Sequence, residues 1–374
     1  MPLDLLWPRP NDYRAIVYFG DATAGAEHIY RQWVDVFEDS GIPYLALFRQ
    51  KKMFDFARRD RPGAAVAFAR SGPALAEIIN SYPKLQVAFY TGNPGNIAQM
   101  MQYHHFKHIF IGHGDSDKAT SSSRMFRLYD EVWVAGQAHA DRLKDVLPDD
   151  VSMVIVGRPQ VMSSFMQERD AEIGPEPVFA YLPTWEGSRE EINYASVPMT
   201  EAIAGSVSEI GGVMRVKFHP SNGARLKKFR DLESELATSA VFGDGRNEIV
   251  ERKFSAASLM DECDYCITDV SSIISDWIVR DRPLFVYRPS NVVLSQSAFP
   301  LESYCYTFRT IKELQADFKR VILDKDDYKG EERTKASNYL VSRSATMSNE
   351  FARRARYLSS DEATAMHEKE VVEM

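Results

Sequence analysis

The chain has 374 residues, of which 44% are hydrophobic, 26% charged and 11% aromatic, and this composition excludes disordered and fibrous proteins. Its length is enough for two sizeable domains. Its 45 basic and 53 acidic residues give a net charge of −8, which argues against a general nucleic-acid binder, because nonspecific duplex binding depends on an excess of Lys and Arg.

Short apolar runs alternate with helical patterns from the first strand onward, which is typical of βαβ units on a parallel sheet. A first α/β domain is predicted over residues 1–165, with a helix from about Ala24 to Asp39. Its strands are predicted at residues 15–19, 44–48, 65–68, 87–90, 109–111, 132–135 and 153–156.

The segment from Arg49 to Arg61 in this domain combines six basic residues with Phe54 and Phe56. This composition suits contact with an anionic membrane surface. The alternative is an ordinary loop and amphipathic helix with a solvated face. Because no apolar run approaches the roughly 20 residues that span a bilayer, any membrane contact is expected to be peripheral.

A polar stretch between Met162 and Pro177 is predicted to lead into a second α/β domain over residues 166–345, with a helix and tail over 346–374. Strands are predicted at 178–182, 214–218, 265–268 and 284–287, and helices at 255–261 and 272–280. Two parallel sheets facing one another would place the loops that follow their strands around a central cleft.

His113 lies between two glycines at the exit of an apolar strand, where a ligand can approach closely. An imidazole suits general-base work near neutral pH, and Asp115 or Asp117 is a candidate to orient it. The alternative is a turn in which the glycines supply unusual backbone angles and the histidine only caps it.

A second histidine, His219, ends another strand in a segment rich in basic residues. Strand alternation places Lys217 and His219 on one face, and six Lys or Arg without an acidic residue lie between Arg215 and Arg230. Phosphate is the expected ligand. A solvated basic loop is the alternative.

The strongest local pattern begins at Thr268 and Asp269, where a buried strand ends, and continues with Ser271 and Ser272, where a helix is predicted to begin. The serine hydroxyls and the first amides of the helix are expected to hold a diphosphate. Alternatively, Asp269 or Ser271 caps the helix and nothing binds. Asp276, one turn further on, is expected near the mouth of the cleft if the helix faces it.

A further strand leads into Thr184 and Trp185. The hydroxyl of Thr184 is predicted to face the ligand, and Trp185 is interpreted as a structural aromatic residue.

Three cysteines, Cys263, Cys266 and Cys305, are too few for a disulfide framework and indicate a reducing compartment. We therefore expect a cytoplasmic protein. The Cys263–Cys266 pair is interpreted as small apolar packing rather than a redox or zinc site.

Taken together and in order, the segments at His113 (HG), Thr184 (PTW), His219 (KFHP) and Thr268 (TDVSSIISDW) resemble the CDP-glycerol glycerophosphotransferase family of teichoic-acid and capsule polymerases. The resemblance covers roughly residues 105–290. It implies a GT-B-like α/β fold of two Rossmann-like domains, an acceptor-side N-terminal one and a C-terminal one that holds the nucleotide, with a C-terminal helix packing back on the first.

The resemblance also implies an activity: transfer of glycerol phosphate, or a related polyol or sugar phosphate, from a CDP-activated donor to a hydroxyl, with release of CMP. It implies that His113 is the base, that His219 binds the diphosphate, that Ser271 and Ser272 hold the phosphates, and that Asp276 is the acidic residue after them. The family's HGTPLK is here HGDSDK, so the acceptor and the polyol stay open.

The acceptor implied by the family is a membrane-linked polyol phosphate or glycan, which would place the protein at the inner face of the membrane through the segment from Arg49 to Arg61. No metal is expected to be required, because helix amides, Lys217 and His219 can neutralise charge. Asp115 and Asp117 are nevertheless spaced like a DxD pair, so magnesium stays an alternative. The rival functions are another GT-B transferase or epimerase and a catalytically silent nucleotide-binding subunit.

Overall fold

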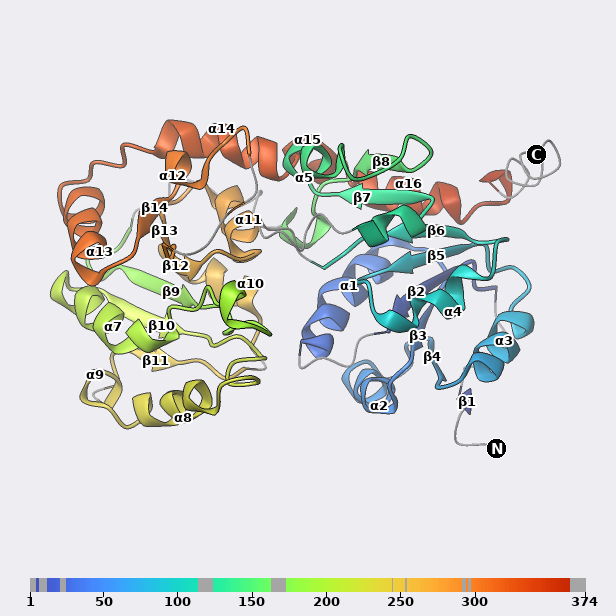
Figure 1. The fold of residues 1–374 in the computed structure, drawn as a ribbon, viewed down its shortest axis with the longest axis horizontal. Coiled ribbons are helices and arrows are strands. Elements are labelled where there is room, and N and C mark those ends of the chain that lie inside the picture. The colour runs from blue at the N-terminus through green and yellow to red at the C-terminus, as the bar shows by residue number, and fades with distance from the viewer. Residues whose placement is uncertain are drawn as a thin grey trace. The chain divides into compact units, whose positions relative to one another are not determined.

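The computed structural model describes residues 5–6, 12–20, 25–113, 124–162, 173–243, 245–252, 254–290, 294 and 297–363. The chain divides into two compact units (Figure 1). Unit 1 comprises the described residues of Met1–Gly114, Ser122–Gln160 and Ser342–Met374, and unit 2 comprises those of Val161–Val341. Each unit is built on its own sheet, so the predicted α/β class with two parallel-sheet domains is confirmed.

The sheet of unit 1 has the order β1-β4-β3-β2-β5-β6-β7-β8. All neighbours are parallel except β1, which pairs antiparallel with β4. The strands are β1 (Leu5–Leu6), β2 (Ala15–Phe19), β3 (Tyr44–Phe48), β4 (Val66–Ala69), β5 (Val87–Tyr90), β6 (Lys107–Phe110), β7 (Glu131–Val134) and β8 (Ser152–Ile155). Because the strand order reverses between β2 and β5, the carboxyl ends of these two strands form the switch point at which α/β sheets bind ligands.

Helices cover both faces of this sheet. On one face, α1 (Ala26–Ser40), α2 (Lys51–Asp60) and α16 (Glu350–Leu358) bury aromatic side chains against β2, β3 and β5. Phe351 of α16 packs against Trp33 of α1 with ring centroids 5.2 Å apart. The opposite face is covered by α3 (Gly72–Ser81), α4 (Ala98–Met101) and α5 (Gln137–Leu143). The C-terminal helix α16 is therefore part of the core of unit 1, although it follows unit 2 in the chain.

His108 in β6 is a buried histidine with a partner at each ring nitrogen. Its Nε2 lies 3.2 Å from the carbonyl oxygen of Tyr103 and its Nδ1 lies 2.7 Å from the hydroxyl of Tyr90. Since a carbonyl can only accept, Nε2 carries the proton and Nδ1 accepts from Tyr90. Burial lowers the pKa of His108, although the nearby Asp130 acts in the opposite direction.

We expect this histidine to make the protein less stable in mild acid. In the unfolded chain the ring titrates near its ordinary value of about 6.5, so the unfolded state takes up the proton first, and stability falls as pH drops from 7 toward the lowered folded pKa. Thermal melts of wild type and His108→Gln between pH 7 and 5 test this. The wild-type melting temperature should fall more steeply; parallel slopes would contradict the assignment.

The sheet of unit 2 is parallel throughout, in the order β11-β10-β9-β12-β13-β14. The strands are β9 (Val178–Leu182), β10 (Val213–Val216), β11 (Glu248–Ile249), β12 (Tyr265–Asp269), β13 (Leu284–Tyr287) and β14 (Tyr306–Phe308). The sequence did not predict β11 and β14, since two- and three-residue edge strands leave too short a pattern. The switch point of this sheet lies between β9 and β12.

One face of this sheet packs against α7 (Thr200–Glu209), α8 (Lys227–Leu236) and α13 (Ile311–Phe318). On the other face lies Cys266, and all three cysteines are buried. Burial raises the pKa of Cys263 to about 12 and that of Cys266 well above its ordinary value. Both thiols therefore stay protonated, as the packing interpretation of this pair predicted.

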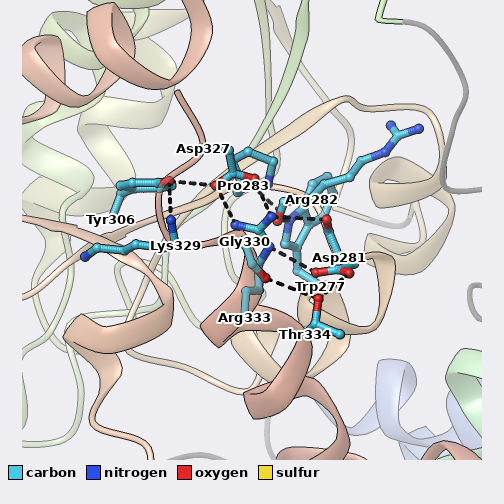
Figure 2. Close-up of polar contacts among 10 residues, drawn as sticks. All are labelled: Trp277, Asp281, Arg282, Pro283, Tyr306, Asp327, Lys329, Gly330, Arg333 and Thr334. Carbon is cyan, nitrogen blue, oxygen red and sulfur yellow. Dashed lines mark hydrogen bonds and ion pairs between the residues drawn. The ribbon is translucent and has the colours of Figure 1, made fainter. Parts of the chain in front are cut away.

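A buried network in unit 2 anchors the end of the helix that follows β12. That helix is α11 (Ile273–Trp277), and its last turn ends at Asp281, which has a left-handed φ of 54°. Arg333 of α14 (Gly330–Leu340) is 2% exposed and bridges Asp281 and Asp327 (Figure 2). Thr334 donates a hydrogen bond of 2.7 Å to Asp281. The network thus fixes the direction of α11, whose first residues follow the predicted phosphate-binding serines.

Candidate functional site

Three of the predicted segments meet at one edge of the unit 2 sheet. Thr184 follows β9, Lys217 and His219 follow β10, and Ser271 follows β12. Because β10, β9 and β12 are neighbouring parallel strands, their carboxyl ends lie side by side at this edge. The structure therefore brings the predicted donor-binding residues together around the switch point of unit 2.

Asp269 and Thr268 lie inside this edge. Asp269 is fully buried, and its carboxylate accepts hydrogen bonds from the amides of Thr184 (2.7 Å) and Ser196 (3.1 Å). Thr268, also fully buried, donates from its hydroxyl to the carbonyl of Leu182 at 2.7 Å. Both side chains therefore hold the loop after β9 against the end of β12. Their predicted contact with a donor stays a prediction.

The serines after β12 are half-buried. The hydroxyl of Ser271 accepts a hydrogen bond of 3.3 Å from the amide of Ile273, so this serine caps the start of α11. Ser272 is the residue immediately before the helix and has no side-chain cap bond. Asp276 in α11 is 7% exposed. Its expected place near the mouth of the cleft stays a prediction.

Lys217 is a buried cation at this edge. Only 6% of it is exposed, and among the described residues no hydrogen bond or ion pair reaches its ammonium. Burial lowers the pKa of Lys217, and the nearby Arg252 lowers it further, while Glu233 acts in the opposite direction. A buried ammonium without an anionic partner is costly, which makes the position receptive to an anion.

His219 has a defined tautomer. Its Nδ1 accepts a hydrogen bond of 3.0 Å from the amide of Ser221, so in the neutral ring the proton is on Nε2. Trp185 lies nearly parallel to the ring, with the centroids 6.3 Å apart and an interplanar angle of 19°. The packing of Trp185 and the amide of Ser221 orient the imidazole so that Nε2 is a hydrogen-bond donor.

Glu186 is a residue at this site that the sequence reasoning missed. It is fully buried and accepts from the backbone amides of Gly223 (3.1 Å), Arg225 (2.8 Å) and Leu226 (2.8 Å). Burial alone would raise the pKa of Glu186, but these amides outweigh it and the pKa is lowered. The ionised carboxylate therefore fixes the loop that begins at His219. The sequence signal for this residue was that its carboxyl group directly follows Thr184 and Trp185, which were already singled out.

His113 in unit 1 is exposed and has the opposite tautomer. Its Nδ1 lies 2.6 Å from the carbonyl oxygen of Thr91, so Nδ1 carries the proton and Nε2 has a free lone pair. Gly112 before it has a left-handed φ of 62°, and its carbonyl accepts 2.7 Å from Trp33. Thr91 directly follows β5, so His113 lies beside the switch point of unit 1. Such a ring can take up a proton at Nε2.

Asp115, predicted as a third catalytic residue, and Asp117 lie outside the described residues. Within the described ranges no group of three or more His, Cys, Asp or Glu is placed to hold a metal ion. Whether magnesium takes part therefore stays a prediction, because the DxD-like pair is not among those residues.

The basic segment from Arg49 to Arg61 differs from an exposed docking surface in two respects. Arg49 and Phe54 are buried, with 5% and 2% exposed: Arg49 directly follows β3, and Phe54 of α2 packs against Phe68. Lys51 and Arg61 also pair with acidic residues. Among the described helices, none combines the length and apolarity needed to cross a membrane.

Residues 122–297 match the family described as CDP-Glycerol:Poly(glycerophosphate) glycerophosphotransferase. The match contains Thr184, His219 and the segment from Thr268 to Asp276, and it begins after His113. It confirms the resemblance predicted from the motifs and the class of enzyme, a CDP-glycerol glycerophosphotransferase-like phosphotransferase. No curated protein matches the chain.

Several solved structures are similar to the chain. A variant of the wall teichoic acid polymerase TagF has a TM-score of 0.58 at 14% identity, covering 97% of this chain and 90% of its own. A putative UDP-N-acetylglucosamine 2-epimerase from Listeria monocytogenes has a TM-score of 0.62 at 11% identity, covering 94% and 98%. A glycosyltransferase from Rickettsia africae has a TM-score of 0.56 at 11% identity, covering 93% and 98%. These similarities confirm the GT-B-like fold class.

Proposed function

We propose that the protein transfers glycerol phosphate, or a related polyol or sugar phosphate, from a CDP-activated donor to a hydroxyl of a teichoic-acid- or capsule-like acceptor. The family match over residues 122–297 supports the donor class. The TagF polymerase has also been solved after a soak with CDPG. The observation that carries the chemistry is the pair of opposite tautomers, a lone pair on Nε2 of His113 and a donor on Nε2 of His219.

In the proposed reaction the acceptor oxygen attacks the phosphorus that bears the glycerol. A new P–O bond forms there, the P–O bond to the cytidylate breaks, and the hydroxyl proton passes to Nε2 of His113. The departing CMP carries the negative charge. The Nε2–H of His219 and the ammonium of Lys217 are proposed to stabilise that charge as it develops, which is the main requirement of phosphoryl transfer.

The serines after β12 and Thr184 complete the proposed donor site. Ser272 has no side-chain cap bond and precedes the first turn of α11, so its hydroxyl is proposed to contact the phosphate oxygens of the donor. Thr184 is 5% exposed, and its amide is held by Asp269. Asp269 and Asp276 are proposed to act by holding these elements rather than by touching the donor.

Incubation with CDP-glycerol, CDP-ribitol and UDP-sugars, with mass spectrometry of the nucleotide products, tests this function. We expect release of CMP from a CDP-polyol. Release of a nucleoside diphosphate would instead favour a glycosyltransferase, one of the two rival classes, and no turnover with any donor would favour a silent binding subunit.

Replacement of His219 by alanine is expected to lower the rate of CMP release by about 10²-fold, the usual effect of removing one donor to a developing negative charge. Replacement of His104, which is exposed on the unit 1 surface, serves as the control and should leave the rate unchanged. Equal rates for wild type and His219→Ala would remove His219 from the mechanism.

A membrane-linked acceptor would bring the protein to the inner face of the membrane. We propose that any such contact involves the exposed Lys52, Arg58 and Arg59 of α2. Their attraction to anionic lipid would be electrostatic, since Phe54 is buried beneath the helix.

A further inference from the structure

Arg49 is a buried arginine without a carboxylate partner. It is 5% exposed, and among the described residues no acidic side chain lies within ion-pair distance of it. Its partners are neutral: Nη2 donates to the carbonyl of Arg70 at 3.1 Å and to the side chain of Gln99, and Nη1 lies 3.4 Å from the hydroxyl of Tyr18. Its Nε has no hydrogen-bond partner.

This pattern leaves the charge of the guanidinium without an anionic partner. Nη2 is occupied by two acceptors, Nε–H is buried without a partner, and Nη1 makes only one long contact. A buried charge of this kind is normally paired, because its desolvation is costly. The neutral acceptors hold the side chain in place, but they do not neutralise it. An anion beside Nη1 would supply the missing charge and accept a hydrogen bond from that nitrogen.

The location of Arg49 connects it with the proposed base. Arg49 directly follows β3, and it reaches toward Tyr18 at the end of β2. The backbone of Tyr18 accepts from the hydroxyl of Thr91, whose own carbonyl holds His113. Arg49 and His113 therefore lie on the same edge of the unit 1 sheet, on either side of its switch point. Their strands β3 and β6 are three strand spacings apart, roughly 14 Å.

We propose that Arg49 binds a phosphate group of the acceptor. This inference rests on the proposed function, since it assigns the anionic part of the acceptor to unit 1, where the proposed base lies. Given the separation from His113, the phosphate bound by Arg49 belongs to the chain behind the attacking hydroxyl. The acceptor class this site fits is an anionic polyol phosphate rather than a neutral glycan.

Direct binding tests the site independently of turnover. With saturating CDP present to occupy the donor site, glycerol 3-phosphate should raise the melting temperature of the wild type, and glycerol should not. Arg49→Gln should weaken the binding of glycerol 3-phosphate at least about tenfold, the effect of losing a charge-assisted hydrogen bond. Lys84→Gln, which removes an exposed cation that precedes β5, is the matched control and should bind as the wild type does.

Kinetics separate this proposal from the proposed function. Arg49→Gln should raise KM for a phosphate-bearing acceptor at least about tenfold, by the same loss, and leave KM for the CDP donor and for a neutral polyol unchanged. Wild type that releases no CMP would refute the function while leaving the binding result to stand. Equal affinity of wild type and Arg49→Gln for glycerol 3-phosphate would overturn the site. If Arg49→Gln does not fold, Arg49→Lys is the second test, because lysine retains the charge but lacks the planar N–H donors of the guanidinium. Unchanged affinity of Arg49→Lys for glycerol 3-phosphate would overturn the site equally.

Discussion

Replacement of His113 by asparagine is expected to lower kcat by about 10²- to 10⁴-fold, the range for loss of a general base. Asparagine is the informative substitution because its side-chain amide can still donate to the carbonyl of Thr91, as Nδ1 of His113 does at 2.6 Å. The strand end and the left-handed Gly112 before it should therefore be preserved. What is lost is the lone pair on Nε2, and the steady-state rate of CMP release measures that loss.

The control for this prediction separates base catalysis from binding. If His113 acts as the base, the KM for the donor and the melting temperature should stay near the wild-type values while kcat falls. Replacement of His104, an exposed histidine of the same unit, should change neither quantity. A fall in kcat that is matched by a comparable loss of stability would show that His113 acts only as a structural element of the turn.

The sequence predicted the parts of the fold that depend on local pattern. Buried parallel strands such as β2 and β9 are continuous apolar runs, and their predicted bounds agree with the structure. The same reasoning placed Thr184, Lys217 and Ser271 at strand ends. It could not establish that these ends adjoin, because that depends on the strand order β10-β9-β12.

Two residues show why the rest could not be predicted. Glu186 accepts from amides of residues 37, 39 and 40 positions further along the chain, so its place after Thr184 and Trp185 does not reveal which groups it holds. Arg49 stands in a run of basic residues that is typical of a surface, yet it is 5% exposed. In both cases the chemistry of the side chain depends on burial, and the pattern of neighbouring residues carries no information about it.

Replacement of Glu186 by alanine is expected to destabilise the protein by about 3–5 kcal/mol, the usual result of removing one partner from a buried charged hydrogen-bond group. The buried amide of Gly223 and those of Arg225 and Leu226 would lose their acceptor. Glu186→Gln is the milder change, because it keeps an oxygen but turns one acceptor into a donor that opposes an amide. Chemical denaturation of both variants measures the effect.

The same carboxylate should control donor binding, because the loop it holds begins at His219 and contains Arg225. For Glu186→Gln we expect KM for the CDP donor to rise about tenfold, as a misplaced charge-assisted contact allows. Glu190→Gln is a close control, since Glu190 is exposed and pairs with the same Arg225 at 2.9 Å; because water screens this pair, its loss should change stability little. The lowered pKa of Glu186 keeps it ionised, so the wild-type loop should be retained on acidification until pH falls through that pKa. If Glu186→Gln and Glu190→Gln proved equal in donor KM and in stability, the buried carboxylate would have no special part in positioning His219.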